Sequence, residues 1–228
     1  MHACIVADGD VPRRSALDLA WPGWSDRIDL VIAADGGARS AEALGLPIGL
    51  VVGDGDSLGP ADLARLASAG VAVEWAPVAK DETDTELALL AAVARGATSI
   101  TVLCAIGGAR LDHALANVML LAHPAAEGRA MRLLDPGARV SLLRAPGRAG
   151  QPVRRELPGL VGALVSLIPL GVTAQGVTTE GLAYPLAGES LVPGPARGCS
   201  NVRTRPTASV TLQSGLLLIV ESPATLPE

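Results

Sequence analysis

The sequence predicts two domains: an α/β domain with a mostly parallel sheet in residues 1–135, and an all-β sandwich in residues 136–228. Apolar runs alternate with helical patterns in the first half, which is typical of a parallel sheet with helices on both faces. After the Asp-Pro-Gly at 135–137 the apolar runs become short and β-like, with frequent Gly and Pro and no convincing amphipathic helix. The length of 228 residues is enough for two modest domains.

The apolar runs of the first half predict buried strands, because they are continuous rather than alternating. These runs are residues 3–7, 30–34, 50–52, 71–75, 100–104 and 131–134. Helical patterns lie between them at residues 38–44, 60–69, 83–95 and 111–122. Pro60 suits a first helical turn, and Thr83 with Glu86 predicts a capping box.

The second half contains β-like runs that predict a small antiparallel sandwich or barrel. They are residues 140–143, 164–169, 176–179, 182–186, 208–212 and 216–220.

Composition excludes several classes of protein. With 49% hydrophobic and 18% charged residues, the chain is globular rather than disordered. A net charge of -5 argues against a nucleic-acid binder, although it suits a site for metal or a cationic substrate. The apolar runs are too short to span a membrane, and the first ten residues do not predict a signal peptide. Three scattered cysteines predict reduced thiols and a cytoplasmic protein.

Aspartates follow three of the predicted strands. Asp35 follows the second, Asp54 and Asp56 the third, and Asp81 and Asp84 the fourth. Because ligands of open parallel sheets bind at the carboxyl ends of strands, we expect these carboxylates to meet around Mg²⁺. We expect Asp54 and Asp56 to point to similar sides, and Asp81 and Asp84 to share a helix face. For any one loop alone, turn and cap chemistry is the better interpretation, but three at one edge favour a metal.

A fourth loop follows the fifth strand. Glycines at 107–108, with Arg110 before a helix, predict a phosphate cradle. Asp112 could join the metal or orient Arg110. His113 and Asn117 share a helix face, although His113 could equally be a capping or core residue. The loop is not a P-loop, and the chain has no strand-linked GxGxxG.

Taken in order, these loops resemble the thiamine pyrophosphokinase family. The segments that carry the resemblance are DGGA at 35–38, GDGDS at 53–57, KDETD at 80–84, RLDH at 110–113 with Asn117, GLAY at 181–184 and Ser-Asn at 200–201. Each segment is weak evidence alone, but together they span most of the chain in the family's order.

The resemblance implies an enzyme that transfers diphosphate from ATP to the hydroxyl of thiamine, giving thiamine diphosphate and AMP. It also implies a homodimer with sites between subunits. The catalytic residues would be Asp54, Asp56, Asp84 and Arg110, and the Mg²⁺ ligands Asp35, Asp54, Asp56, Asp81 and Asp84. The ATP region would comprise Asp35, Lys80, Asp81, Thr83, Asp112, His113 and Asn117, and the thiamine pocket Tyr184, Ser200 and Asn201. Asp56 and Asp84 are the candidates for acceptor of the hydroxyl proton.

Two positions depart from the family pattern. Gly55 stands where the family commonly has an aromatic residue, so the loop could be more mobile or its packing lost. Ala109 separates the paired glycines from Arg110, where its methyl could restrict the approach of backbone to the nucleotide.

The second-domain residues also have simpler interpretations. Tyr184, the only tyrosine, could stack on a cationic ring or anchor a strand edge in the core. Ser200 and Asn201 could bind an aminopyrimidine edge or form a turn. Trp21, Trp24 and Trp75 match no motif, and we interpret them as packing residues.

Two other functions stay open. Asp54 and Asp56 could form the DxD metal site of a phosphatase or nucleotide-sugar transferase, although an aspartyl phosphatase would carry its DxD after the first strand. A non-catalytic nucleotide or thiamine sensor could keep the same fold. We expect neither nucleic acid nor membrane as a partner.

Overall fold

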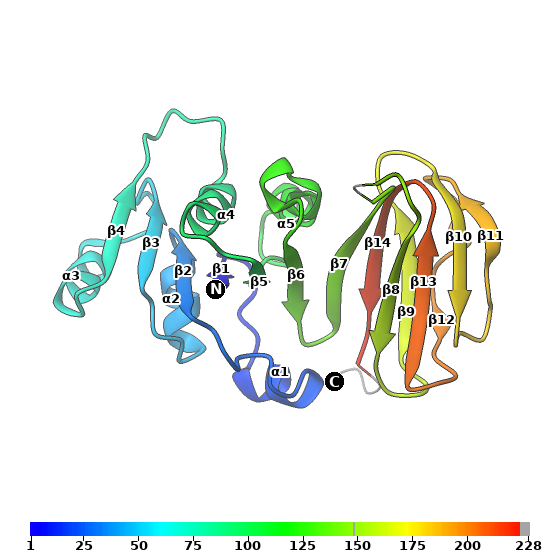
Figure 1. The fold of residues 1–228 in the computed structure, drawn as a ribbon. Helices are drawn as coiled ribbons and strands as arrows, with labels where there is room; N and C mark the ends of the chain where they lie inside the picture. The colour runs from blue at the N-terminus through cyan, green and yellow to red at the C-terminus, as the bar shows by residue number, and fades with distance from the viewer. Residues whose placement is uncertain (148, 224–228) are drawn as a thin grey trace. The chain divides into compact units, whose positions relative to one another are not determined.

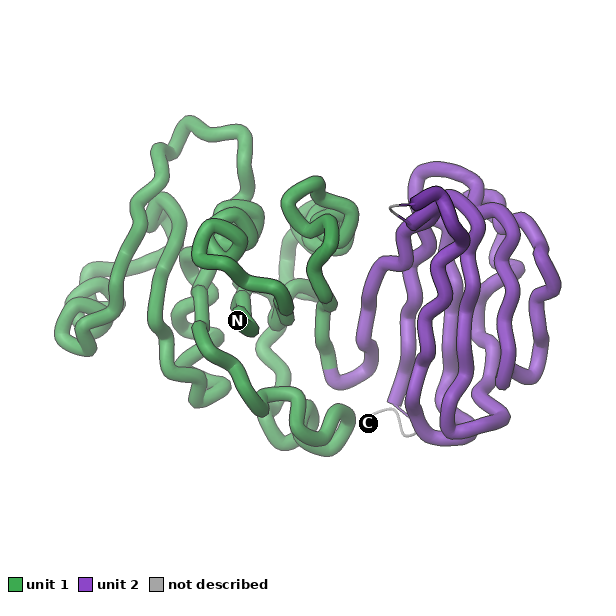
Figure 2. Tube along the Cα trace, in the orientation of Figure 1, with its two compact units in different colours: residues 1–135 green, residues 136–228 purple. Residues whose placement is uncertain are grey.

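The computed structural model describes residues 1–147 and 149–223. The chain divides into two compact units, Met1–Asp135 and Pro136–Glu228 (Figures 1 and 2). None of the helices within the described ranges is long and apolar enough to cross a membrane.

Six strands of unit 1 form a parallel sheet in the order β6-β5-β1-β2-β3-β4, which confirms the predicted α/β class. Their bounds are β1 His2–Val6, β2 Leu30–Ala34, β3 Leu50–Gly53, β4 Ala72–Trp75, β5 Ser99–Leu103 and β6 Ala130–Asp135. The central strands are nearly all buried, as their continuous apolar runs predict.

Helices cover both faces of this sheet (Figure 1). On one face, Leu17 of α1 (Arg14–Ala20) packs with Val6, and Leu66 of α3 (Pro60–Ser68) packs with Val51. Between them lies α2 (Gly37–Ala43). The other face carries α4 (Asp84–Ala94) and α5 (Leu111–Met119), and two short turns follow, η1 (Leu120–Ala122) and η2 (Pro124–Ala126). The sequence missed α1 because Leu17 is its one buried residue, too few to show a helical period.

The strand order reverses between β1 and β5. The chain runs outward from β1 through β2, β3 and β4, and then returns to place β5 on the other side of β1. A reversal of this kind leaves a crevice at the carboxyl ends of the strands, which is where open α/β sheets bind ligands.

Unit 2 is a sandwich of two antiparallel sheets, as predicted. One sheet has the order β12-β9-β14-β7, with bounds Asn201–Val202, Leu164–Pro169, Gly215–Glu221 and Ala138–Ala145. The other has the order β11-β10-β13-β8, with bounds Ala187–Leu191, Ala174–Glu180, Thr207–Leu212 and Val153–Pro158. Apolar side chains of both sheets, such as Leu167, Ile219, Val177 and Val210, form its core.

Two details of unit 2 differ from the prediction. Residues 182–186 form a bend with one bridge, Leu182 to Arg203, and the strand begins only at Ala187. The sequence missed β8 because its charged run at 154–156 hides the alternation, and Leu157 is its one fully buried apolar side chain.

Candidate active site

A cavity of about 370 Å³ lies at the carboxyl ends of β1, β2, β3 and β5. The loops that follow these strands line it, together with the first turns of α4 and α5. Its polar lining includes Asp8, Asp35, Asp56, Ser57, Thr83, Asp84, Thr85, Arg110, His113 and Asn117. The aspartate loops and the glycine loop therefore meet at one crevice.

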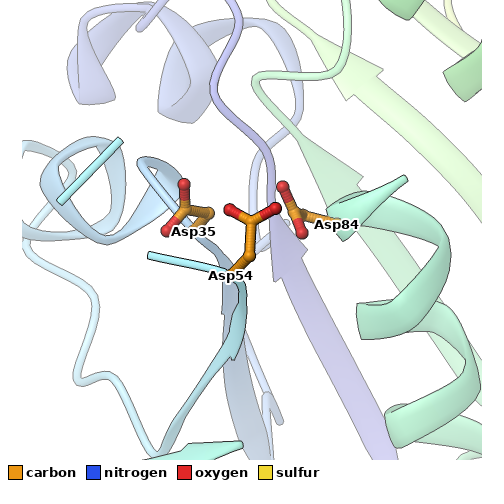
Figure 3. Close-up of side chains that lie close together, drawn as sticks. All are labelled: Asp35, Asp54 and Asp84. Carbon is orange, nitrogen blue, oxygen red and sulfur yellow. The ribbon is translucent and has the colours of Figure 1, made fainter. Parts of the chain in front are cut away.

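Asp35, Asp54 and Asp84 form the centre of the site and are called the acid cluster below. One carboxylate oxygen of each lies within 4.8 Å of the others. Figure 3 shows the three side chains converging from the end of β2, the end of β3 and the start of α4. Carboxylates this close repel one another strongly unless a cation lies among them.

The acid cluster holds one protein cation. Lys80 Nζ lies 2.7 Å from Asp54 Oδ2 and 2.9 Å from Asp84 Oδ1, and its side chain is 11% exposed. The hydrogen bond from Lys80 holds the pKa of Asp54 below its usual value. Burial alone would lower the pKa of Lys80, but its contacts with the two carboxylates outweigh burial and raise it. Lys80 and Asp54 are therefore both charged at neutral pH.

Asp35 is the buried member of the cluster, 3% exposed, with a left-handed backbone (φ 43°). Its Oδ2 accepts a hydrogen bond of 3.0 Å from the Ser57 amide, while Oδ1 has no hydrogen-bond partner among residues 1–147 and 149–223. Burial raises the pKa of Asp35, and the hydrogen bonds from Ser57 oppose this only in part. A buried oxygen without a partner, facing two more carboxylates, fits a site for a hard cation such as Mg²⁺.

Asp56 and Asp81, the other two predicted ligands, lie outside the acid cluster. Asp56 is exposed and lines the cavity, and its carboxyl group adds to the upward shift in the pKa of Asp35. Asp81 is exposed and is not among the residues that line the cavity. The expectation that Asp81 shares a helix face with Asp84 is wrong, because α4 begins at Asp84 and Thr83 is its N-cap. Thr83 Oγ1 accepts the Glu86 amide at 3.2 Å.

The loop after β5 brings backbone and a cation to the cavity. Gly107 and Gly108 adopt positive φ values of 81° and 77° and line the cavity with Ala109. Arg110 forms a two-point ion pair with Asp112, with distances of 2.9 Å and 2.6 Å. This pair raises the pKa of Arg110 and lowers that of Asp112. Asp112 is thus engaged by Arg110 and lies outside the acid cluster.

His113 and Asn117 differ in their surroundings. His113 is exposed and lines the cavity, so it is not a core residue, and the N-cap of α5 is Arg110. Asn117 is buried, and its Nδ2 donates to the Ala105 carbonyl at 2.9 Å. Asn117 therefore ties α5 to the start of the glycine loop.

The three predicted thiamine residues lie together in unit 2. The Asn201 side chain accepts the Tyr184 amide at 2.9 Å and donates to the Tyr184 carbonyl at 2.6 Å. Tyr184 is 64% exposed, which rules out the core interpretation. Ser200 is exposed with a φ of 57°, and its amide donates to Ser166 Oγ at 2.9 Å. Asn201 thus fixes the loop that presents the tyrosine ring to solvent.

Known proteins match both units. A family model described as "Thiamin pyrophosphokinase, catalytic domain" matches residues 23–133, and one described as "Thiamin pyrophosphokinase, vitamin B1 binding domain" matches residues 154–217. The chain belongs to the thiamine pyrophosphokinase family.

Individual relatives agree with this membership. A thiamine pyrophosphokinase of Bacillus subtilis is 27% identical over 218 residues, which are 96% of this chain and 97% of that protein. A crystal structure of a Geobacillus thermodenitrificans thiamin pyrophosphokinase has a TM-score of 0.78 and 26% identity, covering 97% of each chain. A Bacillus subtilis crystal structure has a TM-score of 0.81 over 98% of this chain and 99% of its own, and at 24% identity it supports the fold alone.

The structure explains one departure from the thiamine pyrophosphokinase pattern. Gly55 has a φ of 78°, and a Cβ built on it would lie 2.6 Å from the indole ring of Trp75. An aromatic ring from the end of β4 therefore packs against the loop that carries a glycine in place of an aromatic residue. The loop therefore has an aromatic contact, and Trp75 is a packing residue at the surface, 55% exposed, rather than in the core.

Two acidic residues after β1, Asp8 and Asp10, also lie close to the glycines of the site, and none of the sequence motifs includes them. Asp8 lines the cavity, and a Cβ on Gly36 would lie 2.4 Å from its Oδ2. A Cβ on Gly107 would lie 2.2 Å from Asp10 Oδ2. Glycines at 36 and 107 thus make room for these carboxylates. The Asp-Gly-Asp at 8–10 repeats the pattern at 54–56, and that signal could have found them.

Proposed function

We propose that this chain is a thiamine pyrophosphokinase, which transfers a diphosphate group from ATP to the hydroxyl of thiamine and releases thiamine diphosphate and AMP. The observation that carries the proposal is the acid cluster, of which Asp35 and Asp84 line a cavity shared with the Arg110 loop. Both family models match the chain in order.

The acid cluster fits Mg²⁺, since its ligands are hard carboxylate oxygens and Asp35 Oδ1 is buried without a hydrogen-bond partner among the described residues. Asp35, Asp54 and Asp84 would hold the ion. When bound, it would neutralise phosphate oxygens and the charge that develops on the departing AMP.

The chain's own residues would mainly position the triphosphate. Transfers of this kind depend on alignment and charge neutralisation rather than on a covalent nucleophile. Arg110 can leave Asp112 for a phosphate because both side chains are exposed, at 65% and 64%. The backbone at Gly107 and Gly108 would approach phosphate oxygens closely. We assign the acceptor of the hydroxyl proton to Asp56, which lines the cavity and is not held by Lys80.

Thiamine would bind with its cationic ring on the exposed face of Tyr184, a contact that is generally worth about 0.5–2 kcal/mol. Ser200 would add a polar contact. We also propose a cytoplasmic homodimer with sites between subunits. Buried thiols at Cys4 and Cys104 that form no disulfide suit a reducing compartment.

The test is incubation of purified protein with ATP, Mg²⁺ and thiamine, followed by quantification of nucleotides and thiamine phosphates. Equal amounts of AMP and thiamine diphosphate are expected. Binding of ATP or thiamine without release of AMP would identify a sensor instead. Beryllium fluoride trapped on Asp54 would favour a phosphatase.

A further inference from the structure

The chain has a single lysine, Lys80, among its 18 Lys and Arg residues. This lysine is also the cation that lies between two carboxylates of the acid cluster. Arg binds carboxylates with a rigid planar fork, whereas Lys offers a compact point charge on a flexible stem. The single lysine therefore lies where a flexible side chain could move its charge away from the carboxylates of the acid cluster.

Lys80 satisfies the acid cluster only in part. Its ammonium donates a hydrogen bond to Asp54 Oδ2 and forms an ion pair with Asp84 Oδ1. The buried Oδ1 atoms of Asp35 and Asp84 both lack a hydrogen-bond partner within residues 1–147 and 149–223. One positive charge also cannot balance three ionised carboxylates. The ammonium thus offsets the repulsion between two carboxylates of the cluster, whereas a divalent ion could bind all three.

We propose that Lys80 is a built-in stand-in for the metal, which holds Asp54 and Asp84 together in the metal-free protein and must be displaced when a divalent cation binds. The inference rests on the proposed function, because it takes the acid cluster as the Mg²⁺ site. The ammonium already occupies oxygens that the metal needs. Lys80 lies in the segment between β4 and α4, outside both elements, so movement of its own four-carbon stem is enough to free them.

Displacement of Lys80 links metal binding to nucleotide binding. Mg²⁺ alone must break two ion pairs and leave the ammonium in a largely buried position, so it binds weakly. Mg²⁺ that arrives with a triphosphate supplies a new anionic partner for the displaced ammonium. Each ligand therefore raises the affinity of the protein for the other. Lys80 would thereby lower the affinity of the site for metal ions that are not bound to a nucleotide.

The first experiment measures Mg²⁺ binding to the ATP-free protein by titration calorimetry. Lys80→Met keeps an unbranched stem as far as Cε and removes the charged Nζ, so we expect Mg²⁺ to bind at least tenfold more tightly than to the wild type. Its melting temperature in EDTA should fall, and Mg²⁺ should raise that temperature by more than in the wild type. Arg65→Met is the matched control, since Arg65 pairs with Glu42 and Asp62 and not with the acid cluster, and its Mg²⁺ affinity should be unchanged.

A second experiment needs no variant. Protein labelled with ¹⁵N-lysine gives one Nζ signal, and saturation with Mg²⁺ should shift it and speed its hydrogen exchange. An unmoved signal at saturation, or unchanged or weaker Mg²⁺ affinity in Lys80→Met, would overturn the stand-in role alone. Absence of Mg²⁺ binding in both proteins, even with ATP, would overturn the metal site and the stand-in role together.

Discussion

Asp35→Asn removes one negative charge from the acid cluster with almost no change in volume. The oxygens of the cluster lie within 4.8 Å of one another. At an effective dielectric constant of about 20, two full charges at that separation repel by roughly 3 kcal/mol. Lys80 offsets part of this repulsion, so we expect the metal-free variant to be more stable than the wild type by about 1–2 kcal/mol. For a chain of this length that corresponds to a rise in melting temperature of about 2–8 °C.

The gain in stability should depend on pH. The pKa of Asp35 is raised in the folded state, so the folded protein binds this proton more tightly than the unfolded chain. The contribution of Asp35 to wild-type stability therefore falls as pH rises from the usual pKa of aspartate, about 3.9, through the raised value. The asparagine of the variant cannot ionise, so the gain should grow as pH rises from about 3.9 through the raised pKa of Asp35. Mg²⁺ affinity and turnover should be lost.

The assay is thermal melting in EDTA across a pH series that starts at about 3.9, with turnover measured in parallel. Asp26→Asn is the control, because Asp26 is exposed and precedes β2 at the opposite end of that strand. It should change neither melting temperature nor turnover by a measurable amount. If Asp35→Asn melted at a lower temperature than the wild type and kept its turnover, the electrostatic account of the site would be refuted.

Asp54→Asn and Asp84→Asn should each lower kcat by at least a hundredfold with unchanged circular dichroism, because both remove a ligand of the proposed metal; full activity in both would contradict their role. Asn201→Ala should lower the free energy of unfolding in urea by about 1–3 kcal/mol, because it leaves the amide and carbonyl of Tyr184 without these hydrogen bonds. It should also raise the KM for thiamine more than it lowers kcat. Gly55→Ala should lower the free energy of unfolding by about 1–2 kcal/mol, because alanine is strained at this left-handed φ. Its methyl group should also displace the Trp75 ring, which tryptophan fluorescence would detect. An unchanged spectrum would show that the position of the ring does not depend on a glycine at 55.

The sequence predicted the fold well where one physical signal dominated. The four central strands of unit 1, β1, β2, β3 and β5, are mostly apolar, and burial on both faces leaves no competing pattern. The edge strand β4 forms where predicted, but its side chains are mostly exposed rather than buried. The prediction failed where the signal was weak. Leu17 alone is buried in α1, and charged residues 154–156 interrupt β8. Such elements form because tertiary contacts stabilise them, and a local pattern does not record those contacts.

The candidate site was predictable as a set of loops but not as a set of contacts. Topology alone brings Asp35, Asp54 and Asp84 to one edge of the sheet. The sequence could not show that Lys80 bridges two of these carboxylates or that Asp112 engages Arg110, because such pairings depend on side-chain positions between loops. Asp8 was missed although its Asp-Gly-Asp setting matches that of Asp54.

The most direct measurement of the central claim is anomalous X-ray scattering from crystals grown with Mn²⁺ in place of Mg²⁺ and a non-hydrolysable ATP analogue. The account predicts a manganese peak bound by Asp35, Asp54 and Asp84, with the Lys80 ammonium withdrawn from Asp54 and Asp84 and the triphosphate beside the Arg110 loop. A peak elsewhere, or a triphosphate bound away from these three carboxylates, would contradict it.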